Sequence, residues 1–402
     1  MNKEIKMGNV IKFQKEYLNN KENEEIRKSI SKNGIEKACF NKTLEESLKY
    51  RFNLQIPEMK TYNQNNSYEC NIYAFLRMIK SIMKKDNSIN TKGLDLSATY
   101  IDFYDKLEKI NTFYNEILKE NEITLEMINE KADKYVVIAG TFNSCKKIIN
   151  KYGFVLSKHM NESSNIPYYN ANLMIELLKN KVKSDATILI DRNGENDEVI
   201  KEILMAETYE FLSRILGNPP TKIEYKDELL TPLEFRKKYL RTSLNEYVTI
   251  TPYDKDLLSS SYSFIPSMYL KNNEEIITLS VKDMKNVVIK QLKDGIGVWF
   301  SSEESTTLDY ESGILDDNVF KYNELLNIKQ IPNDYKITLN QINYDHAMCI
   351  TGALIKDKEI KQFKVDNSFG TCGKHKGHLI MTDSFFNNCI ITIIINKKYL
   401  NI

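Results

Sequence analysis

The sequence predicts an α+β protein, and three observations support that prediction. Apolar residues keep helical spacing over residues 8–50 and again over much of 95–250. From about residue 285 onward, short alternating or β-branched runs replace that spacing. Helical patterns followed by strand patterns are typical of α+β folds. The chain has 402 residues, of which 42% are hydrophobic, so it is long enough to bury a sizeable core.

The individual elements follow from local patterns. The polar residues 8–50 predict N-terminal helices, and the polar cluster 63–67 predicts a loop. Apolar positions from Ile72 to Met83 keep helical period, so Cys70 is expected to begin an amphipathic helix. Gly217 and the two prolines after it end the last long helix. Strands are expected at 297–300, 346–354, 362–365, 379–381 and 390–395.

Composition excludes several classes of function. The 56 basic and 55 acidic residues leave a net charge of +1, so no global field draws the protein to nucleic acid or to anionic lipid. Neither a secretory signal nor an apolar stretch of membrane-spanning length is present, so no membrane partner is expected. The six cysteines are scattered without paired spacing, which predicts reduced thiols, no disulfides and a cytoplasmic protein.

Four residues have the pattern of thiol chemistry. A cysteine at a helix N-terminus beside a histidine has a lowered thiol pKa, and Cys70 has the first half of that environment. Gln64, in the preceding loop, could donate to an oxyanion together with the Cys70 N–H. His346 begins a predicted strand as a candidate base. Asn367 follows another strand and could orient the imidazole.

Taken singly, each of these four residues has an ordinary structural explanation, as a buried thiol, a loop amide, a core histidine or a turn former. Cys372, His375 and His378 have a spacing that could bind zinc, but no fourth ligand is evident. We therefore expect no metal and no cofactor.

Three motifs and several dispersed blocks together resemble the bleomycin hydrolase and aminopeptidase C family over nearly the whole chain. Residues 63–70 resemble the family's Asn-Gln-x-x-Ser-x-x-Cys loop, residues 346–348 its base segment, and residues 367–370 its Asn-Ser-Trp-Gly turn. The further blocks are 95–109, 216–220, 230–235, 298–300 and 312–316.

The resemblance implies a papain-like cysteine peptidase core, with a helical lobe, a β-sheet lobe and large helical insertions. It implies that Cys70 is the nucleophile, His346 the base, Asn367 the residue that orients His346, and Gln64 the oxyanion donor. It also implies aminopeptidase activity on short peptides and a homohexamer. The expected segments are an N-terminal helical segment (1–60), the helical lobe with the nucleophile (61–94), a mainly helical insertion and oligomerisation region (95–285), and the β-rich lobe with His and Asn (286–402).

The chain departs from the family pattern beside the nucleophile, at Tyr68, Glu69 and Asn71, and at Phe369, where the family has tryptophan. A Glu69 charge pointing toward Cys70 would disfavour the thiolate. The family's terminal arm is reduced here to residues 401–402, which predicts some cleavage of internal bonds. Two alternatives stay open: a Cys-His acyl transferase, and a non-catalytic peptide-binding or assembly protein that keeps the fold.

Overall fold

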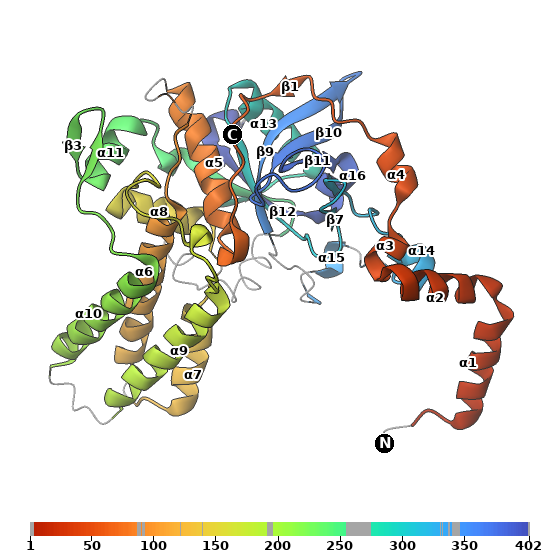
Figure 1. The fold of residues 1–402 in the computed structure, drawn as a ribbon, viewed down its shortest axis with the longest axis horizontal. Helices are drawn as coiled ribbons and strands as arrows, with labels where there is room; N and C mark the ends of the chain where they lie inside the picture. The colour runs from red at the N-terminus through yellow and green to blue at the C-terminus, as the bar shows by residue number, and fades with distance from the viewer. Residues whose placement is uncertain are drawn as a thin grey trace.

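A computed structural model describes residues 4–86, 90, 93–120, 122–138, 140–190, 196–254, 275–329, 331, 333–336, 338–339 and 346–400. The described chain forms a helical half and a sheet half that lie side by side, with a group of N-terminal helices on the far side of the sheet (Figure 1). This is the predicted α+β architecture.

The helical half is built around the helix that begins at Cys70. This helix, α5 (Cys70–Lys85), packs against the long strand β9 (His346–Lys356) on one side and against α6 and α8 on the other. Because both sides are covered, every residue from Asn71 to Met83 is buried, including the polar positions of the amphipathic pattern. The other elements of this half are α6 (Ala98–Leu118), α7 (Leu125–Tyr135), α8 (Phe142–Tyr152), α9 (Ala171–Ile188), α10 (Asp197–Leu216), the hairpin β2 (Ile223–Tyr225) and β3 (Glu228–Leu230), and α11 (Pro232–Tyr239).

The sheet half contains one mixed sheet with the strand order β5-β4-β12-β6-β9-β10-β11-β8-β7, and β1 also pairs with β9. Strands β6 and β12 are buried along their length, as the β-branched run of β12 predicts. The strands are β1 (Leu54–Gln55), β4 (Tyr247–Thr251), β5 (Ile276–Thr278), β6 (Val298–Ser302), β7 (Leu308–Asp309), β8 (Ile314–Leu315), β9, β10 (Glu359–Asp366), β11 (His378–Thr382) and β12 (Ile390–Asn396).

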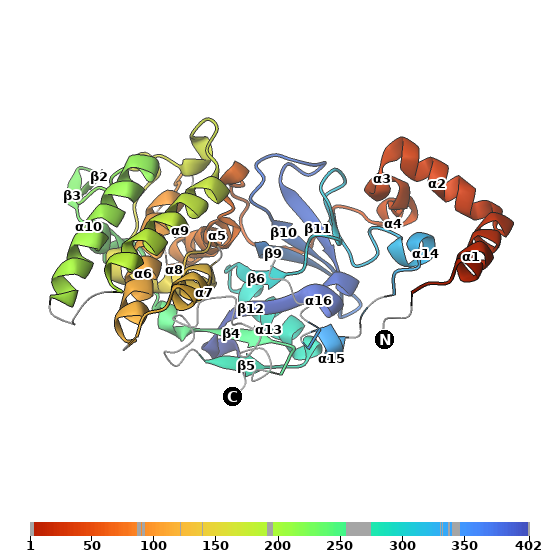
Figure 2. The ribbon, with the colours of Figure 1, turned by 90° about the horizontal axis from the view of Figure 1, so that it is seen from below.

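Four helices lie near the sheet, and the N-terminal helices extend beyond it. Figure 2 shows α1 and α2 reaching away from the body of the protein, and neither helix has a buried residue. The N-terminal helices are α1 (Met7–Asn19), α2 (Lys21–Asn33), α3 (Ile35–Cys39) and α4 (Lys42–Ser47), and those near the sheet are α13 (Val281–Lys293), α14 (Tyr322–Leu326), α15 (Asn333–Lys336) and α16 (Asp383–Cys389). No helix in the described part of the chain is both long and apolar enough to cross a membrane.

The predicted strands all form, but the sheet also recruits residues from the segment expected to be mainly helical. Strand β4 pairs antiparallel with β12, and β5 pairs parallel with β4. A short, fully buried apolar run such as 247–251 has no alternation, so its pattern alone does not separate a strand from a buried helix. The four-segment division of the chain stays a prediction.

Candidate active site

The N-terminus of α5 points Cys70 into a cleft between the two halves. Cys70 is the first residue of the helix and is partly exposed, and it lines a cleft of about 570 Å³. The first N–H groups of a helix have no intrahelical acceptor and carry the positive end of the helix dipole. A thiolate or a developing oxyanion at this position therefore faces unused donors.

His346 and Asn367 meet across two neighbouring strands. Antiparallel pairing sets Asp366, the last residue of β10, opposite Cys349 of β9, so the end of β10 lies beside the start of β9. His346 Nε2 is 2.7 Å from Asn367 Oδ1. Because Oδ1 also accepts a hydrogen bond from the Ser368 N–H at 2.8 Å, it is the acceptor and Nε2 carries the proton. His346 also hydrogen bonds with Cys70, which leaves Nδ1 as the nitrogen for the thiol side.

The turn after Asn367 packs directly on the imidazole. The Phe369 ring stacks on the His346 ring, with centroids 5.4 Å apart and planes inclined by 17°. The Asn367 N–H donates to the Gly377 carbonyl at 3.1 Å, and Gly377 has φ 85°. A Cβ at Gly377 would lie 1.9 Å from the Gly370 carbonyl oxygen, so only glycine allows this closure. Phe369 thus covers the His346–Asn367 contact with an aromatic ring.

Gln64 is held beside the same turn. The Gln64 N–H donates to the Ser368 carbonyl at 2.7 Å, and Ser368 Oγ donates to Gln64 Oε1 at 2.6 Å. Because Oε1 is occupied in this way, the amide NH₂ of this buried side chain is the group left for the cleft. The structure therefore brings together all four residues that the sequence singled out.

A buried carboxylate that the sequence did not single out lies beside Nδ1, the imidazole nitrogen that also faces the thiol. Glu304 Oε2 is 3.3 Å from His346 Nδ1, and the Tyr310 hydroxyl donates to Glu304 Oε1. Burial lowers the pKa of His346, but the charges of Cys70 and Glu304 and hydrogen bonds with Cys70 and Asn367 raise it, to about 9 overall. The site thus favours an imidazolium.

Glu69 points away from the thiol. Its side chain is buried, and Ser163 Oγ donates to Glu69 Oε1 at 3.2 Å. Burial, followed by the charge of Asp102, raises the pKa of Glu69 well above its usual range, and the charge of Glu162 adds to this. Burial thus shifts Glu69 toward its neutral form, and its carboxyl lies toward Ser163.

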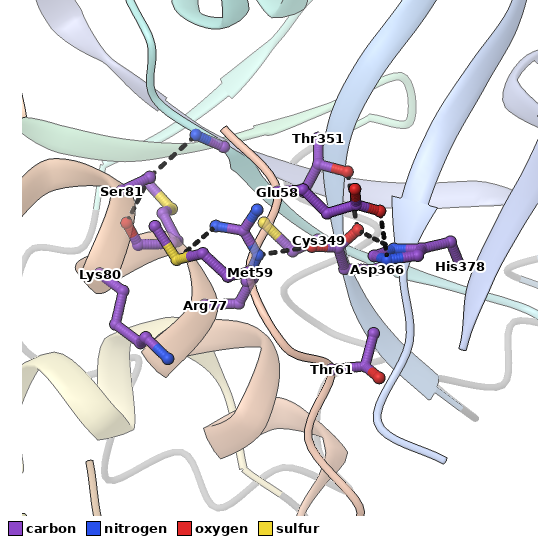
Figure 3. Close-up of polar contacts among 12 residues, drawn as sticks. Glu58, Met59, Thr61, Arg77, Lys80, Ser81, Cys349, Thr351, Asp366 and His378 are labelled. Carbon is purple, nitrogen blue, oxygen red and sulfur yellow. Dashed lines mark hydrogen bonds and ion pairs between the residues drawn. The ribbon is translucent and has the colours of Figure 1, made fainter. Parts of the chain in front are cut away.

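Arg77 links the two halves behind the site (Figure 3). Arg77 Nε is 2.5 Å from Asp366 Oδ2, with both side chains buried. Asp366 Oδ1 accepts hydrogen bonds from Thr351 Oγ1 at 2.8 Å and from His378 Nδ1 at 2.7 Å. Since Asp366 directly precedes Asn367, this network fixes the backbone that carries the amide.

The candidate zinc residues Cys372, His375 and His378 and the cysteines other than Cys70 make separate contacts outside the cleft. Cys372 is exposed, His375 stacks on Tyr50 with centroids 4.1 Å apart, and His378 lies between Asp366 and Glu58. Within the described residues, no group of three or more His, Cys, Asp or Glu side chains could hold a metal ion. Burial raises the pKa of the thiols of Cys145, Cys349 and Cys389.

Comparisons with known proteins agree with this architecture. The model of the Peptidase C1-like family matches residues 4–402. Aminopeptidase E of Lactobacillus helveticus is 28% identical over 99% of this chain and 94% of its own length, and aminopeptidase C of Listeria innocua is 28% identical over 100% and 94%. The crystal structure of PepW from Lactobacillus rhamnosis HN001 superposes with a TM-score of 0.85 at 27% identity, covering 100% of this chain and 94% of that one.

The class of protein is therefore a papain-like α+β protein with a cysteine, a histidine and an asparagine at one cleft. The chain belongs to the Peptidase C1-like family.

Proposed function

We propose that this protein is a cysteine aminopeptidase that trims short peptides from the amino end. In this proposal Cys70 is the nucleophile, His346 the general acid and base, Asn367 the residue that orients the imidazole, and Gln64 an oxyanion donor. The observation that carries the proposal is the His346–Asn367 pair facing a cysteine at a helix N-terminus inside a cleft. Family membership and the aminopeptidase names of the relatives support it.

Acylation uses the protonated imidazole. The Cys70 thiolate attacks the scissile carbonyl carbon, so an S–C bond forms while the Gln64 amide and the Cys70 N–H hold the oxyanion. The C–N bond then breaks, and the proton on His346 Nδ1 passes to the leaving amine. Asn367, which accepts from Nε2, keeps Nδ1 turned toward the sulfur throughout.

Deacylation uses the neutral imidazole. Water attacks the thioester carbonyl, an O–C bond forms, and the S–C bond breaks. The water proton passes to His346, which restores the thiolate–imidazolium pair and releases the carboxylic acid product. One water is consumed for each peptide bond.

The proposal includes a cytoplasmic location and a homohexameric assembly. The six free thiols support a reducing compartment such as the cytoplasm. The homohexamer rests on the family resemblance, and α1 supports an assembly contact because it presents exposed apolar side chains such as Phe13 and Leu18. Peptides are the proposed substrates.

The alternatives have less support. The non-catalytic alternative rested on Tyr68, Glu69 and Asn71, but Glu69 is turned away from the thiol, and Asn71 packs against Gly140 and accepts from Trp299 through its carbonyl. None of the described residues that line the cleft favours acyl transfer to an amine. The expectation of internal cleavage rested on residues 401–402, which lie outside the described residues, and the relatives carry aminopeptidase names.

The test is release of a fluorophore from an aminoacyl amide with a free amino group, under reducing conditions. The parent enzyme is expected to turn over, and Cys70→Ala should lose about 10⁶-fold in turnover. Cys372→Ala, which removes an exposed thiol, is the matched control and should keep the parent rate. An acetylated copy of the substrate should not react.

Turnover that survives in Cys70→Ala would refute the assignment of the nucleophile. Equal rates on the free and acetylated substrates would refute the aminopeptidase specificity while leaving the thiol chemistry intact.

A further inference from the structure

Glu304 is a buried carboxylate beside the imidazole that also faces the Cys70 thiol. It follows β6, is only 7% exposed, and is the single acidic side chain among the described residues that line the cleft. Its two carboxylate oxygens are both engaged, Oε2 by His346 Nδ1 at 3.3 Å and Oε1 by the Tyr310 hydroxyl. The Tyr310 ring packs edge-on against Phe369, which itself stacks on His346. This carboxylate is therefore held in position rather than free to bind a substrate cation.

The hydrogen bonds of the imidazole place Glu304 at the same ring nitrogen as Cys70. Nε2 donates to Asn367, so Nδ1 is the nitrogen that both Cys70 and Glu304 address. The titratable groups that act on the ring are Cys70 from α5 and Glu304, which follows β6. Tyr310 lies next to Glu304, to which its hydroxyl donates. The adjacent Glu303 points elsewhere, with Oε2 3.3 Å from Lys336 Nζ. The Nδ1 proton thus has two anionic partners instead of one.

The two partners behave differently during catalysis. Attack on the substrate converts the Cys70 thiolate to a neutral thioester, so the imidazolium loses that counter-ion. Glu304 is not consumed and stays 3.3 Å from Nδ1. The charge of Cys70 and the charge of Glu304 each raise the pKa of His346. In the acyl-enzyme only the contribution of Glu304 persists.

We propose that Glu304 is a permanent counter-ion of the His346 imidazolium, which keeps the ring protonated after Cys70 is acylated and makes hydrolysis of the acyl-enzyme the pH-limited step. The inference rests on the proposed function, because it assigns a role within that cycle. During acylation His346 Nδ1 still supplies the proton that the leaving amine needs. Water, however, is activated only when His346 is neutral, and Glu304 disfavours that form.

The size of the effect follows from the distance. An opposite charge within about 4–6 Å shifts a pKa by roughly 1–3 units. Each unit changes the neutral fraction of the ring about tenfold at a pH below its midpoint. Replacing Glu304 by the isosteric, uncharged Gln should therefore move the midpoint of deacylation down by roughly 1–3 pH units and speed deacylation at neutral pH about tenfold or more.

The kinetic experiment uses an aminoacyl nitrophenyl ester, whose good leaving group makes deacylation limiting. The parent should show a burst of nitrophenol equal to the active sites, followed by a steady rate that rises with pH. In Glu304→Gln the steady rate should reach its plateau at lower pH. Glu304→Asp keeps the charge and should recover part of the parent profile. Glu303→Gln, which removes the neighbouring carboxylate that pairs with Lys336, should leave it unchanged.

A second readout needs no turnover. Cys70 is capped with methyl methanethiosulfonate, which leaves an uncharged sulfur as the acyl group does, and the ring of His346 is titrated by NMR of histidine labelled at Cε1. The chain has four histidines, so loss of one signal in His346→Gln assigns the resonance. The midpoint of His346 should be lower in Glu304→Gln than in the parent by the same interval as the kinetic midpoint.

The two readouts separate the two proposals. A parent that lacks Cys70-dependent turnover, together with a lowered His346 midpoint in Glu304→Gln, supports the counter-ion pair and refutes the peptidase assignment. An active parent in which Glu304→Gln moves neither midpoint more than Glu303→Gln does overturns the inference and leaves the peptidase intact. Should Glu304→Gln fail to fold, the same comparison is made with Glu304→Ala, which also removes the charge.

Discussion

Removal of Arg77 tests whether the buried pair behind the site holds the two halves together. Arg77→Met replaces the guanidinium with an apolar side chain of similar length. Asp366 then loses its contact with Nε at 2.5 Å but keeps the hydrogen bonds from Thr351 and His378. The side chains of Arg77 and Asp366 are only 3% and 4% exposed, so water does not replace the lost partner.

The cost can be bounded from these contacts. Breaking a buried ion pair by removing one partner costs about 3–5 kcal/mol, because the other charge is left buried. The two remaining hydrogen bonds to Asp366 place the expected cost near the lower end, about 3 kcal/mol. For a chain of 402 residues that lowers the melting temperature by about 3–4 °C.

The dependence on pH gives a signature that loss of packing would not produce. Burial alone would raise the pKa of Asp366, but the charge of Arg77 and hydrogen bonds from His378 and Arg77 lower it well below its usual range. A carboxyl with a lowered folded-state pKa contributes stability above its unfolded pKa, about 3.9, and loses it as the pH falls through the folded value. The stability difference between parent and Arg77→Met should be full at neutral pH and shrink below about pH 4.

The assay is urea unfolding followed by circular dichroism at several pH values between neutrality and pH 3. Arg214→Met is the matched control, because Arg214 and its partner Glu210 are 74% and 59% exposed, and it should change stability by less than about 1 kcal/mol. A difference between parent and Arg77→Met that stays constant down to the lowest pH would show that the cost comes from packing and not from the charge on Asp366.

Three further predictions concern the residues around the thiol. Gln64→Ala should lower kcat by about 10²–10³-fold with little change in KM, because its amide is proposed to act on the oxyanion of the transition state. Asn367→Ala should lower kcat/KM by about 10²-fold, since the imidazole loses the acceptor 2.7 Å from Nε2. Glu69→Gln should leave turnover near the parent value and become more stable relative to the parent as the pH rises. The raised pKa of Glu69 means that its stabilising contribution is full below its unfolded pKa, about 4.3, and is lost as the pH increases toward the folded value, whereas Gln carries no such dependence.

Each of these has its own check. Steady-state kinetics on an aminoacyl amide measures the first two variants, and an equal rise in KM for Gln64→Ala would indicate a role in binding rather than in oxyanion stabilisation. Asn367→Ala must retain the circular dichroism spectrum of the parent for its loss to count. For Glu69→Gln, thermal unfolding at pH 5 and pH 8 is compared with Glu198→Gln, whose side chain is 85% exposed. A stability gain that does not grow with pH would contradict the neutral state of Glu69.

The sequence by itself determined the elements that carry the candidate site. Helical spacing after Cys70 predicted α5, and alternating residues predicted β9 and β10. Strand β9 begins at His346, and β10 ends just before Asn367. These periodicities depend only on backbone geometry within one segment, so they can be read without knowing the neighbours. The motifs of the family resemblance then related the three segments to one another.

The tertiary structure alone decided which buried charges meet. Arg77 stands at a polar position of the α5 pattern, which predicts exposure, and nothing local names Asp366 as its partner. Glu304 carries no signal in its own segment, and its place beside His346 depends on how β6 pairs with β9. The raised pKa of Glu69 likewise depends on its burial next to Asp102 and Glu162. The physical reason is that desolvation and Coulomb interactions are set by which side chains lie within a few ångströms, and packing brings together residues from distant parts of the chain.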